Sequence, residues 1–183
     1  NMTVIVPSDA VQTAWAVNAA AAMDGPVYMR LGRAPVPVIH GEGQEFAIGK
    51  AHTMRMGSDV TIIACGIMVP RALAAAEALS EEGISARVLD MHTVKPLDVN
   101  AVRAAADDTG AIVTAEEHSI IGGLGGAVCE AVCESHPAPV VRVGVRDVFG
   151  RSGKPDELLA AYGLTTEEIV KAARRAMSMK TAV

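Results

Sequence analysis

The stretch from Asp59 to Asp90, DVTIIACGIMVPRALAAAEALSEEGISARVLD, decides the fold of this chain. It opens with the apolar, β-branched run Asp59–Ala64, which predicts a buried strand. An alanine- and leucine-rich stretch over Pro70–Glu82 predicts a helix, and Gly83 ends it. Ile84–Asp90 then predicts a second strand. Short apolar strands alternating with longer helices are typical of a parallel α/β architecture.

The same alternation continues toward the C-terminus. The pattern predicts a helix over Asp98–Asp108, a strand over Ala111–Ala115, a glycine-opened helix over Gly122–Ser135 and a strand over Val140–Val145. Two more helices follow, the last with a capping-box pattern of Thr165 and, three residues on, Glu168. Phe46–Met56 adds one or two short strands. We therefore predict a doubly wound, mostly parallel sheet with helices on both faces.

The segment before this domain predicts a βαβ unit of its own. Met2–Val6 reads as a strand, Ala10–Met23 as a helix capped by Asp9, and Val27–Arg30 as a second strand. The chain opens inside a strand, so we expect it to be a piece of a longer protein. The first strand would otherwise expose an edge, and we expect it to pack against the rest of the chain or against another copy.

Composition excludes several classes of function. The formal net charge is −5 and aromatic residues make up 3% of the chain, which argues against nucleic acid as a partner. No apolar run approaches the roughly 20 residues that span a bilayer. Three cysteines without a CxxC pair suit a reducing compartment. We expect a cytoplasmic protein with no membrane partner.

Two segments could bind an anion. Arg30 and Arg33 follow a predicted strand, where α/β proteins bind ligands, and their guanidinium groups suit phosphate. Solvent-exposed arginines with no ligand would give the same pattern. Ser119–Gly126 (SIIGGLGG) opens a predicted helix, but Glu116 and Glu117 just before it would repel a phosphate. There the glycines could instead allow close packing at a subunit interface.

Other reactive side chains give weaker signals. Cys129 and Cys133 lie four residues apart on one predicted helix face, and we interpret them as small buried side chains because no further ligands have zinc-site spacing. The patterns G-x-S-x-G, G-x-x-x-x-G-K-[ST] and H-E-x-x-H are absent from the sequence. We therefore assign no catalytic, cofactor-binding or metal-binding residue. Partners could not be assigned to His40, His52, His92 and His136.

Several motifs together resemble the C-terminal half of the thiamine-diphosphate enzymes of the transketolase group. They are VPSDA (6–10), GKA (49–51), GSDVTI (57–62), KPLD (95–98) and GGLG (122–125). Two further stretches are more similar to transketolases than to other members, and they are TAEEHSI (114–120) and DVFGRSG (147–153) with YGLT (162–165). The strongest resemblance is to the C-terminal subunit of a split transketolase, in which two chains share the enzyme.

The resemblance implies a domain organisation and one site residue. Residues 1–33 would be the C-terminal remnant of a pyrimidine-binding domain, residues 34–45 a linker, and residues 46–183 the transketolase C-terminal domain. Arg33 would bind the phosphate of a sugar-phosphate substrate. The family's residues for thiamine diphosphate and Mg²⁺ have no counterpart here, so the resemblance implies a chain that binds neither by itself.

The function that the resemblance implies is transfer of a two-carbon ketol unit between sugar phosphates, together with an N-terminal transketolase subunit or domain. We expect the chain alone to be inactive, mainly a dimerisation and structural domain, and part of a homodimer. Two alternatives stay open. The chain could belong to 1-deoxyxylulose-5-phosphate synthase or a 2-oxo acid dehydrogenase beta subunit, or it could be a non-catalytic dimerisation module.

Overall fold

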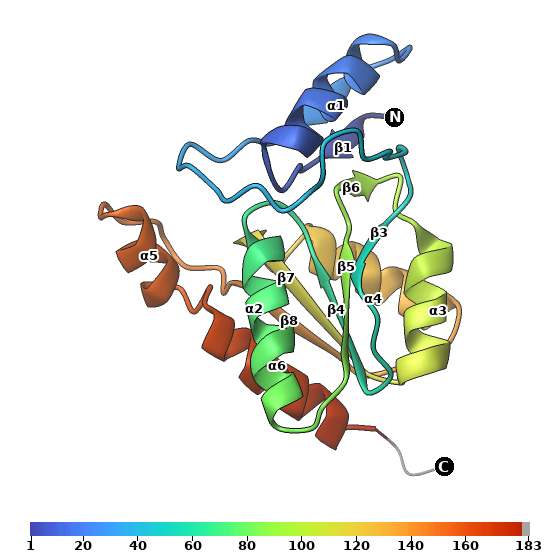
Figure 1. Cartoon of the computed structure of the whole chain (residues 1–183), viewed down its shortest axis with the longest axis vertical. Coiled ribbons are helices and arrows are strands. Elements are labelled where there is room, and N and C mark those ends of the chain that lie inside the picture. The colour runs from blue at the N-terminus through green and yellow to red at the C-terminus, as the bar shows by residue number, and fades with distance from the viewer. Residues whose placement is uncertain (181–183) are drawn as a thin grey trace.

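The computed structural model describes residues 1–180, and its centre is a five-stranded sheet (Figure 1). The β4–β5, β4–β7 and β7–β8 pairs are parallel, and only the edge strand β3 runs antiparallel to its neighbour. All five residues of the central strand β4 are buried. In sheet order the strands are β3 (His52–Arg55), β5 (Ala86–Asp90), β4 (Val60–Ala64), β7 (Ile112–Ser119) and β8 (Val140–Val145).

Helices cover both faces of this sheet, because alternate residues of a strand point to opposite sides. Ile62 of β4 joins the core under α2 (Met68–Glu81) and α6 (Thr166–Ser178). Ile63 joins the core under α3 (Val99–Thr109) and α4 (Leu124–Glu134). The predicted doubly wound, mostly parallel fold with helices on both faces is confirmed.

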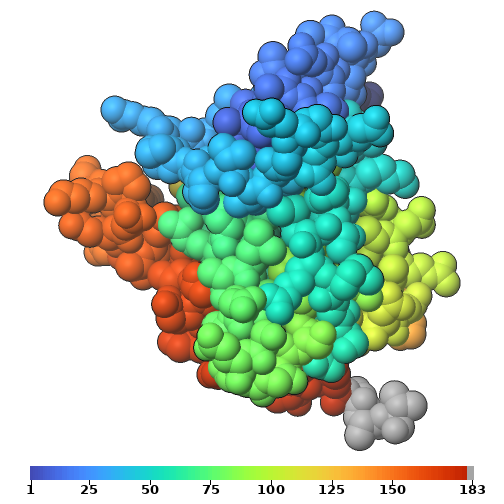
Figure 2. All heavy atoms as spheres, in the orientation of Figure 1, coloured from blue at the N-terminus to red at the C-terminus, as the bar shows by residue number. Residues whose placement is uncertain are grey.

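A second, three-stranded sheet caps one end of the body. Its middle strand, β1 (Thr3–Ile5), pairs in parallel with β2 (Val27–Met29) across α1 (Ala10–Ala21). On its other side β1 pairs antiparallel with β6 (Thr93–Lys95), a strand that the sequence analysis did not predict. Both edges of β1 are therefore covered by its own chain, and in Figure 2 the blue N-terminal residues lie directly on the body.

Backbone contacts continue this junction beyond β1. The amide of Val6 donates to the carbonyl of His92 at 2.7 Å, and the amide of Gly66 donates to the carbonyl of Val6 at 3.2 Å. The predicted linker over residues 34–45 has no helix or strand, but His40 within it is buried. The division at residues 33 and 45 stays a prediction.

The caps predicted at the starts of α1 and α6 are present in the structure. The Asp9 carboxylate accepts from the amide of Gln12 at 2.8 Å, as expected of a helix cap. Thr165 caps α6 by accepting from the amide of Glu168 at 3.4 Å. The carboxylate of Glu168 accepts from Lys171 instead of completing a capping box.

Several elements differ in length from the prediction. α2 begins at Met68, two residues before Pro70, α1 ends at Ala21 rather than at Met23, and β7 runs on to Ser119 rather than ending at Ala115. Ser119 pairs with Val145 after an irregularity in the ladder, so β8 extends the strand beyond its apolar core. Across residues 1–180, none of the helices combines the length and the hydrophobicity needed to cross a bilayer.

Candidate functional site

The main sheet has a switch point between β4 and β7. From β4 the chain first builds β5 on one side, and it later returns to build β7 on the other side. Connections diverge at such a point, which makes it the preferred ligand crevice of open α/β sheets. Arg30, just after β2, reaches this point and lies 3.4 Å from the Glu117 carboxylate. The first of the two predicted arginines is therefore neutralised by an internal ion pair.

A hollow of about 520 Å³ opens beside this ion pair. We call it the arginine hollow; it is lined by the segment Arg30–Pro37 (without Leu31), by Ile67 and Arg71, and by residues of α5 (Pro155–Ala161) with Tyr162. In Figure 2 the light-blue segment and the orange α5 region lie next to each other on the left side of the molecule. The hollow therefore involves the N-terminal segment and the main domain together.

Arg33 lines the arginine hollow with its side chain exposed. Within residues 1–180 it makes no ion pair and no side-chain hydrogen bond, unlike Arg71, which donates to the carbonyl of Ile67 at 3.0 Å and lies 3.7 Å from the Asp156 carboxylate. An unpaired guanidinium on the wall of a cavity is free to bind an anion. The role expected for Arg33 stays a prediction that this geometry permits.

The glycine-rich opening of α4 already holds an anion, which is the carboxylate of Glu116. Its two oxygens accept from the amides of Leu124 and Gly125, each at 2.7 Å. Burial raises the pKa of Glu116, although these two N–H groups oppose the shift. A Cβ atom on Gly123 would collide with the same carboxylate. The alternative of an external anion at this helix N-terminus is therefore wrong, and Gly123 and Gly125 pack against side chains of the chain's own strands β7 and β8.

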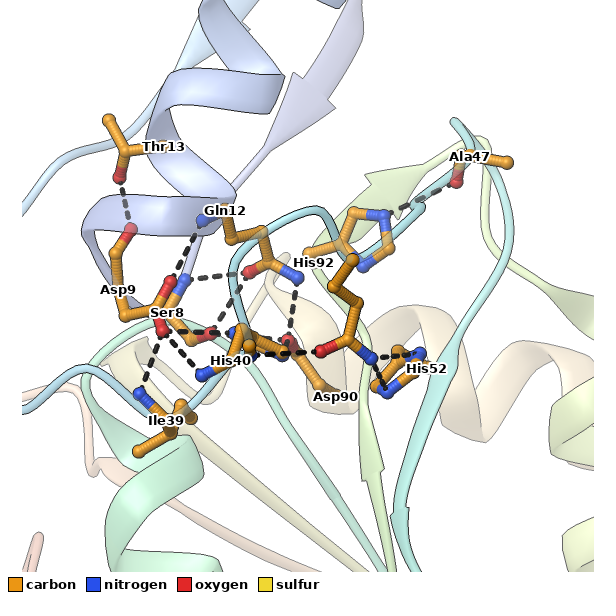
Figure 3. A network of polar contacts seen from close by, with 12 residues as sticks. Ser8, Asp9, Gln12, Thr13, Ile39, His40, Ala47, His52, Asp90 and His92 are labelled. Atoms are coloured by element: carbon orange, nitrogen blue, oxygen red, sulfur yellow. Dashed lines mark hydrogen bonds and ion pairs between the residues drawn. The ribbon is translucent and has the colours of Figure 1, made fainter.

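A buried polar network joins the N-terminal unit, the segment 34–45 and the main domain (Figure 3). His40 lies at its centre, with Nδ1 3.1 Å from Asp9 Oδ2 and Nε2 3.3 Å from Asp90 Oδ2. All three side chains are 0% exposed, although neither ring N–H points squarely at its carboxylate. Gln12 Nε2 donates to Asp90 at 2.7 Å, and the Ser8 hydroxyl donates to the same oxygen at 3.2 Å.

Within this network, the charged forms of His40 and Asp9 stabilise each other, and the pKa values of both groups are shifted accordingly. Burial by itself would lower the pKa of His40, but the Asp90 and Asp9 carboxylates outweigh it and raise that pKa. Burial would raise the pKa of Asp9, but the amides of Gln12, Ile39 and His40 and the His40 charge hold it below its usual value. Both carboxylates therefore favour the protonated form of the His40 ring that lies between them.

Two further histidines, His52 and His92, lie near His40, and their environment favours the neutral form of each ring. Burial lowers the pKa of His92, and burial together with the nearby His40 charge lowers that of His52. Phe46 lies within 6 Å of all three imidazoles, at centroid distances of 4.9 Å to His40 and 5.7 Å to each of the other two. Because the central side chains are sealed from solvent, we assign this network to the junction rather than to substrate.

Sequence reasoning missed the network because its members lie far apart in the chain. His40 follows Asp9 by 31 positions and precedes Asp90 by 50, so no local spacing connects them. One signal was available: Asp90 ends the strand β5, and polar residues at the carboxyl end of a buried strand often face a junction or a site.

The remaining candidates do not form a reactive centre in the part of the chain described. Cys133 is exposed and Cys129 is half-buried, so the expectation that both are buried is wrong. His136 instead forms an exposed ion pair with Asp107 at 2.9 Å. Among residues 1–180, no group of three or more His, Cys, Asp or Glu side chains is arranged to hold a metal ion.

Comparison with known proteins gives consistent matches. Residues 49–169 match the family model described as the transketolase C-terminal domain. The chain is 52% identical over 98% of its length to the 6-deoxy-6-sulfo-D-fructose transketolase subunit SqwH of Clostridium sp. strain MSTE9, and covers 56% of that protein. It is 47% identical over 94% of its length to one of the subunits of the apulose-4-phosphate transketolase of Phocaeicola vulgatus, covering 55% of it.

Solved structures agree. A structure described as a split gene transketolase, inactive beta4 tetramer, superposes with a TM-score of 0.94 at 49% identity, over 99% of this chain and 58% of that one. The transketolase from Leishmania mexicana superposes with a TM-score of 0.72 at 27% identity, over 100% of this chain and 26% of that one. The chain thus spans little more than half the length of the split relatives, and it belongs to the transketolase family, whose C-terminal domain it contains.

Proposed function

We propose that this chain is the C-terminal section of a split transketolase subunit, which transfers a two-carbon ketol unit between sugar phosphates once assembled with an N-terminal partner. The observation that carries the proposal is the structural match to a split gene transketolase over 99% of the chain with a TM-score of 0.94. The relatives described above carry transketolase names, which favours ketol transfer over a synthase or dehydrogenase reaction.

Arg33 is proposed to bind the anionic end of the sugar. The names of two relatives specify a sulfonated sugar in one case and a phosphorylated sugar in the other. Both groups carry several oxygens with delocalised negative charge, which a guanidinium can contact through two parallel N–H groups. Arg33 has the required freedom, because no carboxylate within residues 1–180 neutralises it.

The arginine hollow does not fit thiamine diphosphate with magnesium by itself. Its lining contains Glu117 and Asp156, but these pair with Arg30 and Arg71, and no cluster of metal ligands forms among the described residues. In the complete enzyme the cofactor would supply the chemistry of breaking and forming the carbon–carbon bond. Its ligands would come from outside this chain, so we propose that the chain alone is inactive.

The remaining assignments are proposals of the same kind. Residues 1–33 would complete a pyrimidine-binding domain that begins upstream, and residues 46–183 would form the C-terminal domain that helps to build a homodimer. The structure described as an inactive beta4 tetramer supports association between copies of such chains. Transketolase chemistry on sugar phosphates suits a cytoplasmic location.

Donor selectivity tests the proposed reaction. The complete subunit, its N-terminal partner, thiamine diphosphate and Mg²⁺ are mixed with an aldose phosphate and with either xylulose 5-phosphate or pyruvate, and products are identified by mass. Ketol transfer from xylulose 5-phosphate supports the proposal. Consumption of pyruvate would move the protein to the synthase or dehydrogenase alternatives. A chain that assembles with no turnover on any donor would favour a non-catalytic dimerisation module.

Arg33→Ala in the same complex tests the site. Loss of a hydrogen bond to a charged group is worth about 1.5–3 kcal/mol, so KM for the anionic sugar should rise roughly 10- to 100-fold with a smaller change in kcat. Arg103→Ala is the matched control, because Arg103 forms an exposed ion pair on α3 with Asp107, away from the hollow. An unchanged KM in Arg33→Ala would remove Arg33 from the substrate site.

A further inference from the structure

The arginines of this chain divide into two groups. Six form ion pairs with carboxylates within residues 1–180, and they are Arg30, Arg55, Arg71, Arg87, Arg103 and Arg174. Of the others, Arg33 lines the arginine hollow, and Arg151 lies over the ring of Tyr162 at 5.8 Å. The remaining three have no carboxylate partner among the described residues, and all three line one other cavity.

That cavity, which we call the basic hollow, has a volume of about 430 Å³ and lies between β8 and α6. Arg146 approaches it from the end of β8, and Lys171 and Arg175 from successive turns of α6. Arg142 also lines it from β8, but its side chain extends along the opposite face of the sheet, against Gly125 of α4. Glu168 is the one acidic side chain in its lining, and its carboxylate is 2.7 Å from Lys171. Three cationic side chains and one carboxylate thus surround a concave surface of a protein whose overall net charge is −5.

The geometry fixes one of these cations in place. Arg146 Nη2 donates to the carbonyl of Arg142 at 2.9 Å. This contact uses one guanidinium nitrogen and leaves the charge unneutralised. Like charges that line one hollow repel one another, and this cost is relieved when an anion binds between them. Solvent-exposed cations that bind nothing have no reason to gather around one hollow.

We propose that the basic hollow binds a small ligand carrying a diphosphate or triphosphate group. Planar guanidinium groups from two elements can contact several phosphate oxygens at once. The volume lies within the range of small-molecule sites, about 300–1,000 Å³, and so admits a nucleotide-sized molecule. Tyr162 also lines the hollow and could contact an attached base or sugar.

This site is separate from the one proposed for the sugar. Among the described residues, Tyr162 alone lines both the basic hollow and the arginine hollow. The inference is therefore independent of the transketolase reaction, and it can be tested by binding without a substrate or an N-terminal partner.

The test is calorimetry on the 183-residue chain at two salt concentrations, with pyrophosphate, ADP and adenosine as separate probes. Binding of both pyrophosphate and ADP, but not of adenosine, would identify the diphosphate as the group recognised. Tighter binding of ADP than of pyrophosphate would show a contribution from the nucleoside. Exposed cations lose affinity as salt rises, so binding should weaken at the higher salt concentration without vanishing.

Charge-removing variants locate the site. The double variant Arg146→Gln/Arg175→Gln should weaken pyrophosphate binding at least tenfold, and both side chains are exposed, so the fold should be retained by circular dichroism. Arg174→Gln is the matched control, because Arg174 is next to Arg175 but pairs with Glu82 outside the hollow. Equal losses in the control and the double variant, or no pyrophosphate binding by the parent chain below millimolar concentration, would overturn the proposal.

Discussion

Replacing His40 should detach the N-terminal unit from the main domain. The substitution His40→Leu removes the charge between Asp9 and Asp90 and leaves two carboxylates buried at 0% exposure. At the observed distances of 3.1 and 3.3 Å, each ion pair attracts by roughly 5 kcal/mol at an effective dielectric constant of about 20, before the cost of desolvation. Removing one partner of such a buried pair destabilises a protein by about 3–5 kcal/mol.

The expected cost is local as well as global. Asp9 caps α1 and Asp90 ends β5, so the penalty falls on the junction that the two carboxylates share. Hydrogen exchange of the amides of β1 and α1 should accelerate by about 100-fold or more, because each 1.4 kcal/mol changes an opening equilibrium tenfold. Amides of β4, at the centre of the main sheet, should change less.

The dependence on pH has a definite sign. The pKa of His40 is raised above its usual 6.5 by Asp90 and Asp9, which outweigh burial. Its stabilising contribution is therefore fully present below pH 6.5 and is lost as pH rises through the folded-state pKa. The lowered pKa values of His52 and His92 act oppositely and reduce stability as pH falls below 6.5. Urea unfolding of the parent chain between about pH 6.5 and pH 8.5 should show declining stability, and His40→Leu should flatten that slope.

Two comparisons separate this effect from a simple loss of packing. The double variant His40→Leu/Asp90→Asn should recover part of the stability lost in His40→Leu, because it removes one of the unpaired charges. His136→Leu at the exposed ion pair with Asp107 should cost at most about 1 kcal/mol. A cost below about 1 kcal/mol for His40→Leu, or an unchanged pH slope, would refute a charged His40.

Two further predictions concern close packing and thiol reactivity. Gly123→Ala should destabilise the chain by about 1–3 kcal/mol in urea unfolding, because its new Cβ would collide with the Glu116 carboxylate. A Cβ on Gly126 would have no atom within 4 Å, so Gly126→Ala should leave the stability unchanged or raise it by up to about 1 kcal/mol. The exposed Cys133 should react first with Ellman's reagent, and Cys65, whose buried thiol has a raised pKa, should react only on unfolding; early labelling of Cys65 would contradict its burial.

The main sheet could be predicted from the sequence because its signals are local. The run Val60–Ala64 is apolar throughout and became the buried central strand, and Gly83 ended the next helix within two residues of the expected place. The short strand β6 could not be predicted, because Thr93–Lys95 has only three residues and is defined by pairing with β1, some ninety positions away.

The functional residues, too, could be predicted only where their signal is local in the sequence. Arg33 was a candidate because it follows a strand and matches a family motif, and both are readable along the chain. The His40 network was not, since ion pairs between distant residues leave no periodic trace in sequence. Glu116 was correctly read as an obstacle to an external phosphate, but its own role could not be predicted, because its carboxylate is itself the anion that binds the start of α4.

The strand β6 has a consequence for how such proteins can be recombined. It belongs to the part of the chain that matches the C-terminal family model, yet it completes the sheet of the N-terminal unit. A chimaera joined within residues 34–45 would therefore combine β1 from one parent with β6 from another, and would divide Asp9 from Asp90 as well. A chimaera of two relatives should fold only where the β1–β6 pair and the Asp9–His40–Asp90 network both come from the same parent. The N-terminal unit and the main domain are therefore expected to evolve together, although each has its own sheet.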